Sequence, residues 1–317
     1  MTKLVWSAVF VMFVFAFAPA DALAQRKPQP ANSYDPAHKV EDHDFAVDAE
    51  ILWAVDVIAP AFRLENDQLA GYGAQAVDWF IDRIAHHPIK LTSLPRGRAF
   101  DIMRHASATN DRTVCMPGLL ETEARAREFI ISNTVLSQFP VSVIVRADHA
   151  DAFAPFMNDA GEIDLVRLLL DRQFDAALES GRSYGELVDD ILREYGFGEH
   201  VQKTRQSADF ITMLTLERID WFLAYPIEAE HHRLAANHPA MIKSLPIEGM
   251  PDFLDAKIIC STTDAGYHVI EHTNAIIAEM PDMPWATGYI DLLSPDDAKR
   301  YQELIKNRQA RNIRAGN

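Results

Sequence analysis

Short apolar runs alternate with helix-spaced apolar positions along the chain after residue 44. Ala49 to Val57 is a short, mostly apolar run, which is typical of a buried strand. Gly71 to Ala85 places its apolar residues at helical spacing. A strand at Pro88 to Thr92, a helix after Pro95 and a strand at Arg112 to Met116 follow. This order predicts a parallel sheet covered by helices.

The same alternation begins again at Val141. Predicted strands lie at Val141–Val145, Phe174–Leu178, near Val201 and at Trp221–Leu223, and predicted helices at Leu165–Leu170, Tyr184–Tyr195, Ala208–Leu216 and Glu228–Asn237. A second α/β unit is therefore nested inside the chain. A strand at Lys257–Cys260, an amphipathic helix at Ala265–Glu279 and a largely polar helix from Pro295 to Arg308 complete the pattern.

The first residues have the composition of a secretory signal peptide. Lys3 provides a positive charge, Leu4 to Ala18 is almost wholly apolar, and Ala22 to Ala24 forms a small-x-small cleavage site. The alternative is a membrane anchor, but the apolar run is shorter than the roughly 20 residues that a spanning helix needs. We predict a signal peptide at 1–24 and export to the periplasm. The polar, proline-bearing segment 25–44 is predicted to be a flexible leader.

The charge of the chain argues against nucleic-acid binding. Asp and Glu outnumber Lys and Arg by 46 to 30, which gives a formal net charge of −16. Affinity for phosphates comes chiefly from Lys and Arg, and no block rich in these residues interrupts the acidic composition. The length of 317 residues fits about two domains.

The chain has two cysteines, Cys115 and Cys260. In an exported protein they are better explained as a disulfide than as a metal site, although two buried free thiols remain an alternative. If they pair, the last segment returns to the first unit. The predicted lobes are then 45–133 plus 255–317 for lobe 1 and 134–254 for lobe 2, with two crossovers between them.

Three segments, taken in order, resemble extracellular solute-binding proteins of family 3. Thr122 to Ser132 is similar to the family's T-x-E-R-x-x-x-V-D-F-S motif, Leu69 to Gly73 to its G-x-G-y/f entry to the first helix, and Arg218 to Leu223 to its G-R-x-D-A-x-L strand. The resemblance covers roughly residues 49 to 300. It implies an α/β, two-lobed type II periplasmic-binding-protein fold, with each lobe a mainly parallel sheet flanked by helices.

The resemblance also implies a ligand site between the lobes. The family's carboxylate-binding arginine corresponds to Arg125, whose guanidinium can donate two parallel hydrogen bonds to a carboxylate. A surface arginine paired with Glu121 or Glu128 is the alternative. Gly181, Arg182 and Ser183 lie at a predicted strand-to-helix turn, where they could bind an anion or where Ser183 could simply cap a helix.

Further candidate ligand residues are Tyr72, Arg98 and Tyr225. Tyr225 stands where amino-acid binders of the family place the aspartate that holds the α-ammonium group, and Ala59 stands where they place a stacking aromatic residue. These departures favour a carboxylate or another organic anion over a zwitterion.

A metal-dependent hydrolase is the alternative from a different class. His268, Glu271 and His272 form an H-x-x-E-H pattern, which on a helix sets two imidazoles one turn apart. We predict instead that the chain is not an enzyme and needs no cofactor. The expected partners are a small anionic or amino-acid-like ligand and the membrane subunits of an ABC importer, with the protein acting as a monomer. A sensor or accessory role without transport remains a further alternative.

Overall fold

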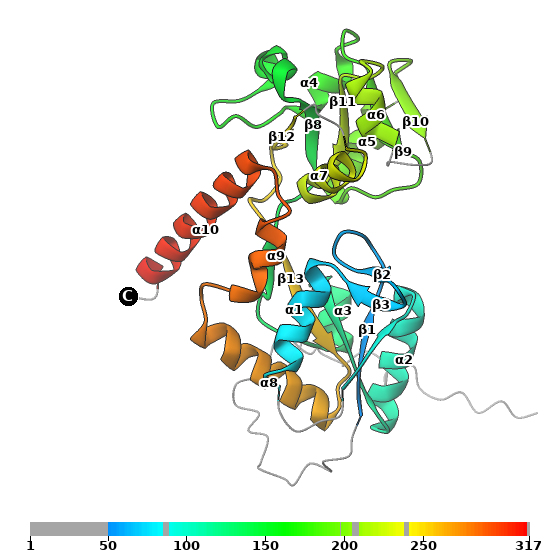
Figure 1. Cartoon of the computed structure of the whole chain (residues 1–317), viewed down its shortest axis with the longest axis vertical. Coiled ribbons are helices and arrows are strands. Elements are labelled where there is room, and N and C mark those ends of the chain that lie inside the picture. The colour runs from blue at the N-terminus through cyan, green and yellow to red at the C-terminus, as the bar shows by residue number, and fades with distance from the viewer. Residues whose placement is uncertain (1–49, 85–88, 197, 205–208, 238–240, 316–317) are drawn as a thin grey trace, which may run out of the picture. The chain divides into compact units, whose positions relative to one another are not determined.

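A computed structural model describes residues 50–84, 89–196, 198–204, 209–237 and 241–315 (Figure 1). The predicted signal peptide and leader lie outside these residues. Among the described helices, none combines the length and the apolar composition needed to cross a bilayer.

The first sheet has the strand order β4-β1-β5-β13-β6, and β7 also pairs with β13. Its strands are β1 (Ile51–Val55), β4 (Ile89–Ser93), β5 (Thr113–Leu120), β6 (Ile130–Ile131), β7 (Leu136–Gln138) and β13 (Leu254–Cys260). Successive residues of β1 point to opposite faces, so Trp53 and Val55 join one core and Ala54 joins another. Both faces of this sheet are therefore covered.

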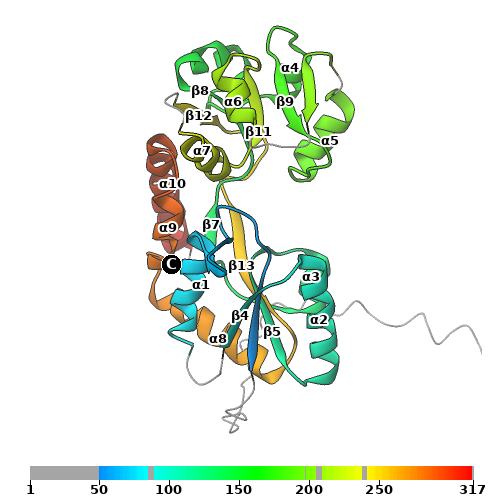
Figure 2. The ribbon, with the colours of Figure 1, turned by 45° about the vertical axis from the view of Figure 1, so that its right-hand side comes forward.

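Helices from distant parts of the chain cover the two faces of the first sheet (Figure 2). Helices α1 (Tyr72–Ile81) and α8 (Asp264–Glu279) pack in the core with Trp53 and Val55, and α2 (Arg96–Thr109) and α3 (Glu123–Glu128) pack in the core with Ala54. The helical spacing of the apolar residues predicted three of these helices, and the fourth, α3, is too short to show a period.

The second sheet has the strand order β10-β9-β11-β8-β12. Its strands are β8 (Ser142–Arg146), β9 (Ala176–Glu179), β10 (Val201–Thr204), β11 (Trp221–Ala224) and β12 (Ile242–Leu245). One face packs against η2 (Ala147–Phe156), α4 (Leu165–Leu170) and α5 (Glu186–Tyr195), and the other packs against α6 (Phe210–Thr215) and α7 (Pro226–Ala235). The nested α/β unit predicted from the sequence is confirmed.

The sheets are mixed rather than mainly parallel, which corrects one detail of the prediction. Strand β1 runs parallel to β4 and β5, but β13 runs antiparallel to β5, β6 and β7. In the second sheet β9 is parallel to β10 and β11, whereas β8 is antiparallel to β11 and β12. A short apolar run has the same sequence pattern in either direction, so the connections of the tertiary fold decide how it pairs.

The chain passes between the two sheets twice, as the predicted crossovers require. It leaves the first sheet after β7, enters the second at β8, and returns from β12 to β13. Because β7 still pairs with β13, the first passage begins after Gln138.

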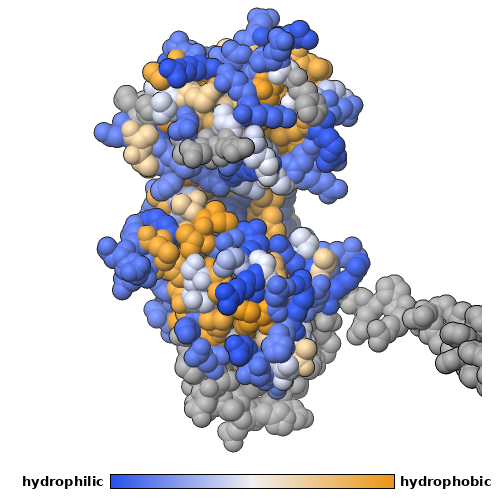
Figure 3. Space-filling view, turned by 90° about the vertical axis from the view of Figure 1, so that its right-hand side faces the viewer, coloured by the Kyte–Doolittle hydropathy of each residue, from blue (hydrophilic) through white to orange (hydrophobic). Residues whose placement is uncertain are grey.

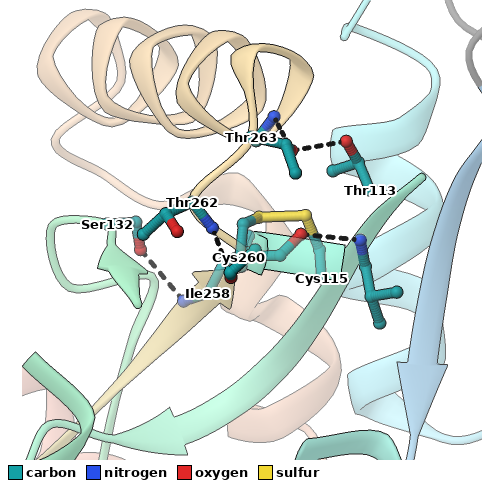
Figure 4. The surroundings of a disulfide bond; sticks show 11 residues. Thr113, Cys115, Ser132, Ile258, Cys260, Thr262 and Thr263 are labelled. Atoms are coloured by element: carbon teal, nitrogen blue, oxygen red, sulfur yellow. Dashed lines mark hydrogen bonds between the residues drawn. A yellow bond between two sulfur atoms is a disulfide. The ribbon is translucent and has the colours of Figure 1, made fainter. Parts of the chain in front are cut away.

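The cysteines form a disulfide, as predicted (Figure 4). Cys115 on β5 and Cys260 on β13 are register partners, and both are fully buried. Hydrogen bonds surround the bridge: the hydroxyls of Thr113 and Thr263 lie 2.6 Å apart, and the Ile258 N–H donates to Ser132 Oγ at 2.9 Å. The bridge thus joins segments 145 residues apart inside the first sheet.

Short elements were not predicted from the sequence. The hairpin of β2 (Arg63–Glu65) and β3 (Gln68–Ala70) has too few positions to show a period of two. Its turn residues Asn66 and Asp67 both have positive φ, 51° and 61°. Asn and Asp are favoured at such turn positions, so this pair of residues could have indicated the hairpin. The other unpredicted elements are α3, η2, β6, β7, β12, η4 (Pro284–Ala286) and α9 (Thr287–Ile290).

The last helix, α10 (Pro295–Ala315), is bonded to strands of both sheets. Ser244 Oγ of β12 donates to Asp297 Oδ2 at 2.9 Å, and the Arg308 guanidinium donates to Asp255 of β13 at 2.8 Å. The largely polar helix predicted from Pro295 is confirmed and continues to Ala315.

Candidate functional site

A cavity of about 240 Å³ lies at the carboxyl end of β1. Its wall comes from the loop after β1, the inner face of α1, parts of β5, β7 and β13, and the start of α7. Ligands of open α/β sheets bind at this edge, beyond the carboxyl ends of the strands. The position of the cavity therefore agrees with a ligand site.

Glycines let α1 begin directly against the loop that lines the cavity. Gly71 has φ of 111°, and a Cβ there would lie 2.4 Å from the carbonyl oxygens of Pro60 and Ala61. A Cβ on Gly73 would lie 2.7 Å from the Phe62 ring. Close approach of the two backbones requires glycine at both positions.

Tyr72, between these glycines, lines the cavity as the sequence suggested. Its ring is buried and meets Tyr289 edge-on, with ring centroids 5.3 Å apart. Burial, and then the negative charge of Glu228, raise the pKa of the Tyr72 hydroxyl. Tyr72 therefore stays protonated and contributes an aromatic face and a neutral hydroxyl.

Arg125 lies beside the cavity rather than in its wall. The Thr122 side chain caps α3 by accepting from the Arg125 N–H, and Nη1 of Arg125 donates to the carbonyl oxygen of Leu120 at 2.5 Å. Leu120 is itself a lining residue. Burial, and then the charge of Arg96, lower the pKa of the half-buried Arg125 guanidinium, which remains a cation at neutral pH.

The carboxylates near Arg125 in the sequence are bound to other cations. Glu121 pairs with Lys257, Glu128 with Arg104 at 2.7 Å, and Glu123 with Arg127. The alternative in which Arg125 pairs with Glu121 or Glu128 is therefore not what the structure contains. Among the described residues, Arg125 has no carboxylate partner.

Two other ion pairs lie at the cavity. Asp56, directly after β1, lines it and pairs with Arg96 at 3.4 Å. Glu228, in the first turn of α7, also lines it and accepts from Arg182 at 2.5 Å. Both lining carboxylates are thus already neutralised by arginines.

Arg182 is held among side chains of the second sheet's unit. It also donates to Glu179 at 3.2 Å, and its guanidinium lies 5.6 Å from the centroid of the Tyr225 ring. Burial raises the pKa of Glu228, and the charge of Arg182 and its hydrogen bond oppose that rise. An anion at Arg182 would have to compete with these two carboxylates.

Gly181 and Ser183 precede α5 but do not line the cavity. Ser183 Oγ donates to Asp189 Oδ2 at 2.5 Å, and the Tyr184 N–H donates to Asp189 Oδ1 at 2.8 Å. The carboxylate of Asp189 therefore occupies donors that the sequence suggested for an anion.

The remaining candidates separate into two groups. Tyr225 lines the cavity, with its hydroxyl pKa raised by burial and by Glu228. Arg98 is exposed in the first turn of α2 and is not a lining residue.

Within the described residues, the histidine pattern on α8 is not part of a metal-ligand set. The rings of His268 and His272 have centroids 4.0 Å apart, and His272 Nδ1 bonds the carbonyl oxygen of His268 at 3.0 Å. Within the described ranges, no group of three His, Cys, Asp or Glu side chains could hold a metal ion. The hydrolase alternative therefore has no zinc site in the described structure.

Sequence reasoning missed Asp56, Glu228 and the pairing of Arg96. Asp56 is the first polar residue after an apolar strand, which is a usable signal because site residues collect at strand ends. Glu228 had no such signal, since only the packing of α7 brings it to the cavity.

No family model matches the chain, and no curated protein sequence matches it. Solved structures do resemble it. An ancestral cationic amino acid solute-binding protein is 12% identical with a TM-score of 0.54, covering 78% of this chain and 96% of the other. Substrate-binding domain 2 of GlnP from Lactococcus lactis is 14% identical with a TM-score of 0.54, covering 78% and 95%.

A third similar structure is a probable amino-acid ABC transporter extracellular-binding protein, YtmK of Bacillus subtilis. It is 14% identical with a TM-score of 0.53, and the match covers 78% of this chain and 98% of that one. At such identity the likeness concerns the fold. The chain has the two-lobed type II periplasmic-binding-protein fold that the sequence resemblance implied.

Proposed function

We propose that this protein is an exported solute-binding protein that captures a small carboxylate-bearing or amino-acid-like ligand between its two lobes. In this proposal lobe 1 is 45–133 plus 255–317 and lobe 2 is 134–254. Residues 1–24 direct export to the periplasm and are cleaved. The protein acts as a monomer, without enzymatic activity, and delivers its ligand to the membrane subunits of an ABC importer.

One observation carries the proposal: Arg125 is a half-buried cation with no carboxylate partner among the described residues, and it is bonded to the wall of the cavity. A partly desolvated cation is costly unless an anion neutralises it. A planar guanidinium binds a carboxylate through two parallel hydrogen bonds. A bound carboxylate would supply the missing charge.

The lining of the cavity supports capture by both lobes. Most of the wall belongs to elements of the first sheet's unit, but Tyr225, Ile227 and Glu228 come from the second. A ligand that touches both units favours the conformation in which both contacts exist, by as much as it binds that conformation better.

The test is thermal unfolding of the purified protein against amino acids, organic acids, oligopeptides and sugars. A ligand at 100 times its dissociation constant stabilises the folded state by about 2.7 kcal/mol. We expect carboxylate-bearing ligands to raise the unfolding temperature of wild type and of Arg127→Ala, but not of Arg125→Ala. Arg127 is the matched control because it lies on the same helix and pairs with Glu123.

The proposal fails if no compound in the set stabilises the wild type, or if Arg125→Ala responds as strongly as Arg127→Ala. Stabilisation by zinc, abolished in His268→Ala, would restore the hydrolase alternative.

A further inference from the structure

The wall of the cavity is made largely of hydrocarbon. Ile58 and Leu120 lie near the charged groups, whereas Val77, Phe80, Ile258 and Trp285 belong to the buried core of the first sheet's unit. The cavity therefore extends from a charged region into the apolar interior. A polar ligand group there would lose its bonds to water without replacement.

The outside of the same unit is also apolar in places. Ile58, which lines the cavity, is 44% exposed, and its neighbour Val57 is 39% exposed. Figure 3 shows apolar residues, in orange, gathered on the surface of the part that holds the first sheet. An apolar ligand would thus meet apolar side chains at Ile58 and again inside the cavity.

The size of the cavity suits a ring or a short alkyl chain. Its volume is about 240 Å³, whereas an apolar cavity of roughly 150 Å³ in another protein is large enough for benzene. A phenyl ring with a linker of a few carbon atoms matches this space.

The charges at the cavity favour an anionic head group over an amine. Asp56 and Glu228 are the lining carboxylates, and arginines hold both of them. To pair with a lining carboxylate, an ammonium group would have to displace one of these arginines. Position 225 carries a tyrosine rather than an aspartate, so it offers no further negative charge to an ammonium group. Arg125, in contrast, hydrogen-bonds only the carbonyl oxygen of Leu120 among the described residues, and its guanidinium lies 5.3 Å from the centroid of the Phe100 ring, so it keeps its net charge.

Building on the proposed function, we infer that the ligand is an amphipathic organic acid: an aryl or alkyl carboxylate whose apolar body fills the cavity and whose carboxylate binds Arg125. The apolar wall favours ligands with an apolar body, and the Arg125 guanidinium favours ligands with a negative charge. Amino acids with polar side chains do not suit this cavity. Their side chains would lie in the apolar interior, and their ammonium group would find both lining carboxylates already paired with arginines.

The experiment measures binding of a matched set of compounds by isothermal titration calorimetry. The set is 4-phenylbutyrate, butyrate, 4-phenylbutylamine and L-glutamine. We expect 4-phenylbutyrate to bind the wild type at least tenfold more tightly than each of the others. Straight-chain acids from butyrate to octanoate should gain about fourfold in affinity per methylene while the cavity still has room.

Two pairs of variants locate the two halves of the ligand. Ala76→Leu fills the cavity from α1, and Ala108→Leu adds the same group on the exposed face of α2. We expect affinity for 4-phenylbutyrate to fall about tenfold in Ala76→Leu and to stay unchanged in Ala108→Leu. Arg125→Ala should lose at least tenfold in affinity, and Arg127→Ala should bind as the wild type does.

The inference is overturned if butyrate, L-glutamine or 4-phenylbutylamine binds as tightly as 4-phenylbutyrate, or if Ala76→Leu binds 4-phenylbutyrate with wild-type affinity. The series of straight-chain acids needs no variant, so it decides the matter even if Ala76→Leu does not fold. If a hydrophilic carboxylate binds through Arg125 and chain length has no effect, the amphipathic ligand is wrong and the proposed function stands. If no compound of the wider set binds, the proposed function fails as well.

Discussion

Charged side chains that are buried in this protein depend on the partners that replace water around them. Around the cavity, Arg182 and Glu228 neutralise each other, whereas the only side-chain hydrogen bond of Arg125 to a described residue goes to a carbonyl oxygen. The same chemistry recurs at Asp297, a buried carboxylate that accepts from the hydroxyls of Ser244 and Ser294, each at 2.9 Å. A buried charge is tolerated where hydrogen bonds and an opposite charge replace water.

Asp297 leads to a pH prediction. Burial raises the pKa of its carboxyl, and Arg300 and the two serine hydroxyls oppose the rise. The folded state thus keeps this proton to a higher pH than the unfolded state, whose pKa is about 3.9. The stability from this group is fully present below that pKa and is lost as pH rises through the raised folded pKa.

We therefore expect the free energy of unfolding of wild type, relative to Asp297→Asn, to decrease as pH rises from about 4 to 7. Urea unfolding of both proteins across this range measures it. Asp255→Asn is the control of opposite sign: burial raises the pKa of Asp255, but hydrogen bonds from Arg308 and Ser137 outweigh burial and lower it. Wild type should lose its advantage over Asp255→Asn as pH falls below about 4. A wild-type advantage over Asp297→Asn that grows with pH would contradict the prediction.

Among the elements, α1 most directly shapes the cavity. It supplies Tyr72, Ala76, Val77 and Phe80 to the wall, and it can do so because its first turn lies against the loop after β1. The Gly73 N–H donates to the carbonyl oxygen of Ala61 at 2.9 Å, so backbone bonds hold the two segments together. The first turn of α1 is therefore held by close packing against this loop as well as by backbone hydrogen bonds.

Gly73→Ala tests that constraint. The new methyl group would lie 2.7 Å from the Phe62 ring and 2.9 Å from the carbonyl oxygen of Ala61. We expect a loss of about 1–3 kcal/mol in the free energy of unfolding, measured with urea, because the backbone oxygen cannot move aside freely.

Gly97→Ala is the matched control, since Gly97 lies in the first turn of α2 and nothing lies within 4 Å of its Cβ position. This change should leave stability equal or raise it by up to about 1 kcal/mol, because alanine loses less entropy in a helix. Equal effects of the two substitutions would show that close packing at Gly73 is not the cause.

At the scale of the whole molecule, the disulfide joins β5 and β13 of the first sheet. Cys115 and Cys260 are 145 residues apart, and the entire second sheet lies between them in the sequence. Closing a long loop removes conformational freedom chiefly from the unfolded chain. The bridge therefore stabilises the return of β13 to the first sheet.

We predict that Cys115→Ala/Cys260→Ala lowers the free energy of unfolding by about 4 kcal/mol. Denaturant unfolding without reductant gives this value. Under a strong reductant, once the bridge is broken, the wild type should unfold near the midpoint of the double variant, while the double variant itself should not respond. A reductant that shifts both proteins equally would contradict this explanation.

The sequence by itself determined which segments became the longer helices and strands, because a buried face imposes a period of 3.6 or 2 on enough positions to be seen. The two cysteines and the motif that contains Arg125 could also be recognised in the sequence. Here the information lies in the residue types and their local order rather than in a period. Strand direction, the hairpin at 63–70 and the short elements that connect the sheets were not visible.

Only the tertiary structure determined the cavity and the charges around it. Glu228 and Asp56 reach one cavity through the packing of α7 and the end of β1. Arg125 has no carboxylate partner in the part of the chain that the structure describes, because Glu121 pairs with Lys257 and Glu128 pairs with Arg104. The apolar interior of the cavity arises where core residues of several elements leave space between them. Such convergence depends on long-range contacts, and no local pattern of residues encodes it.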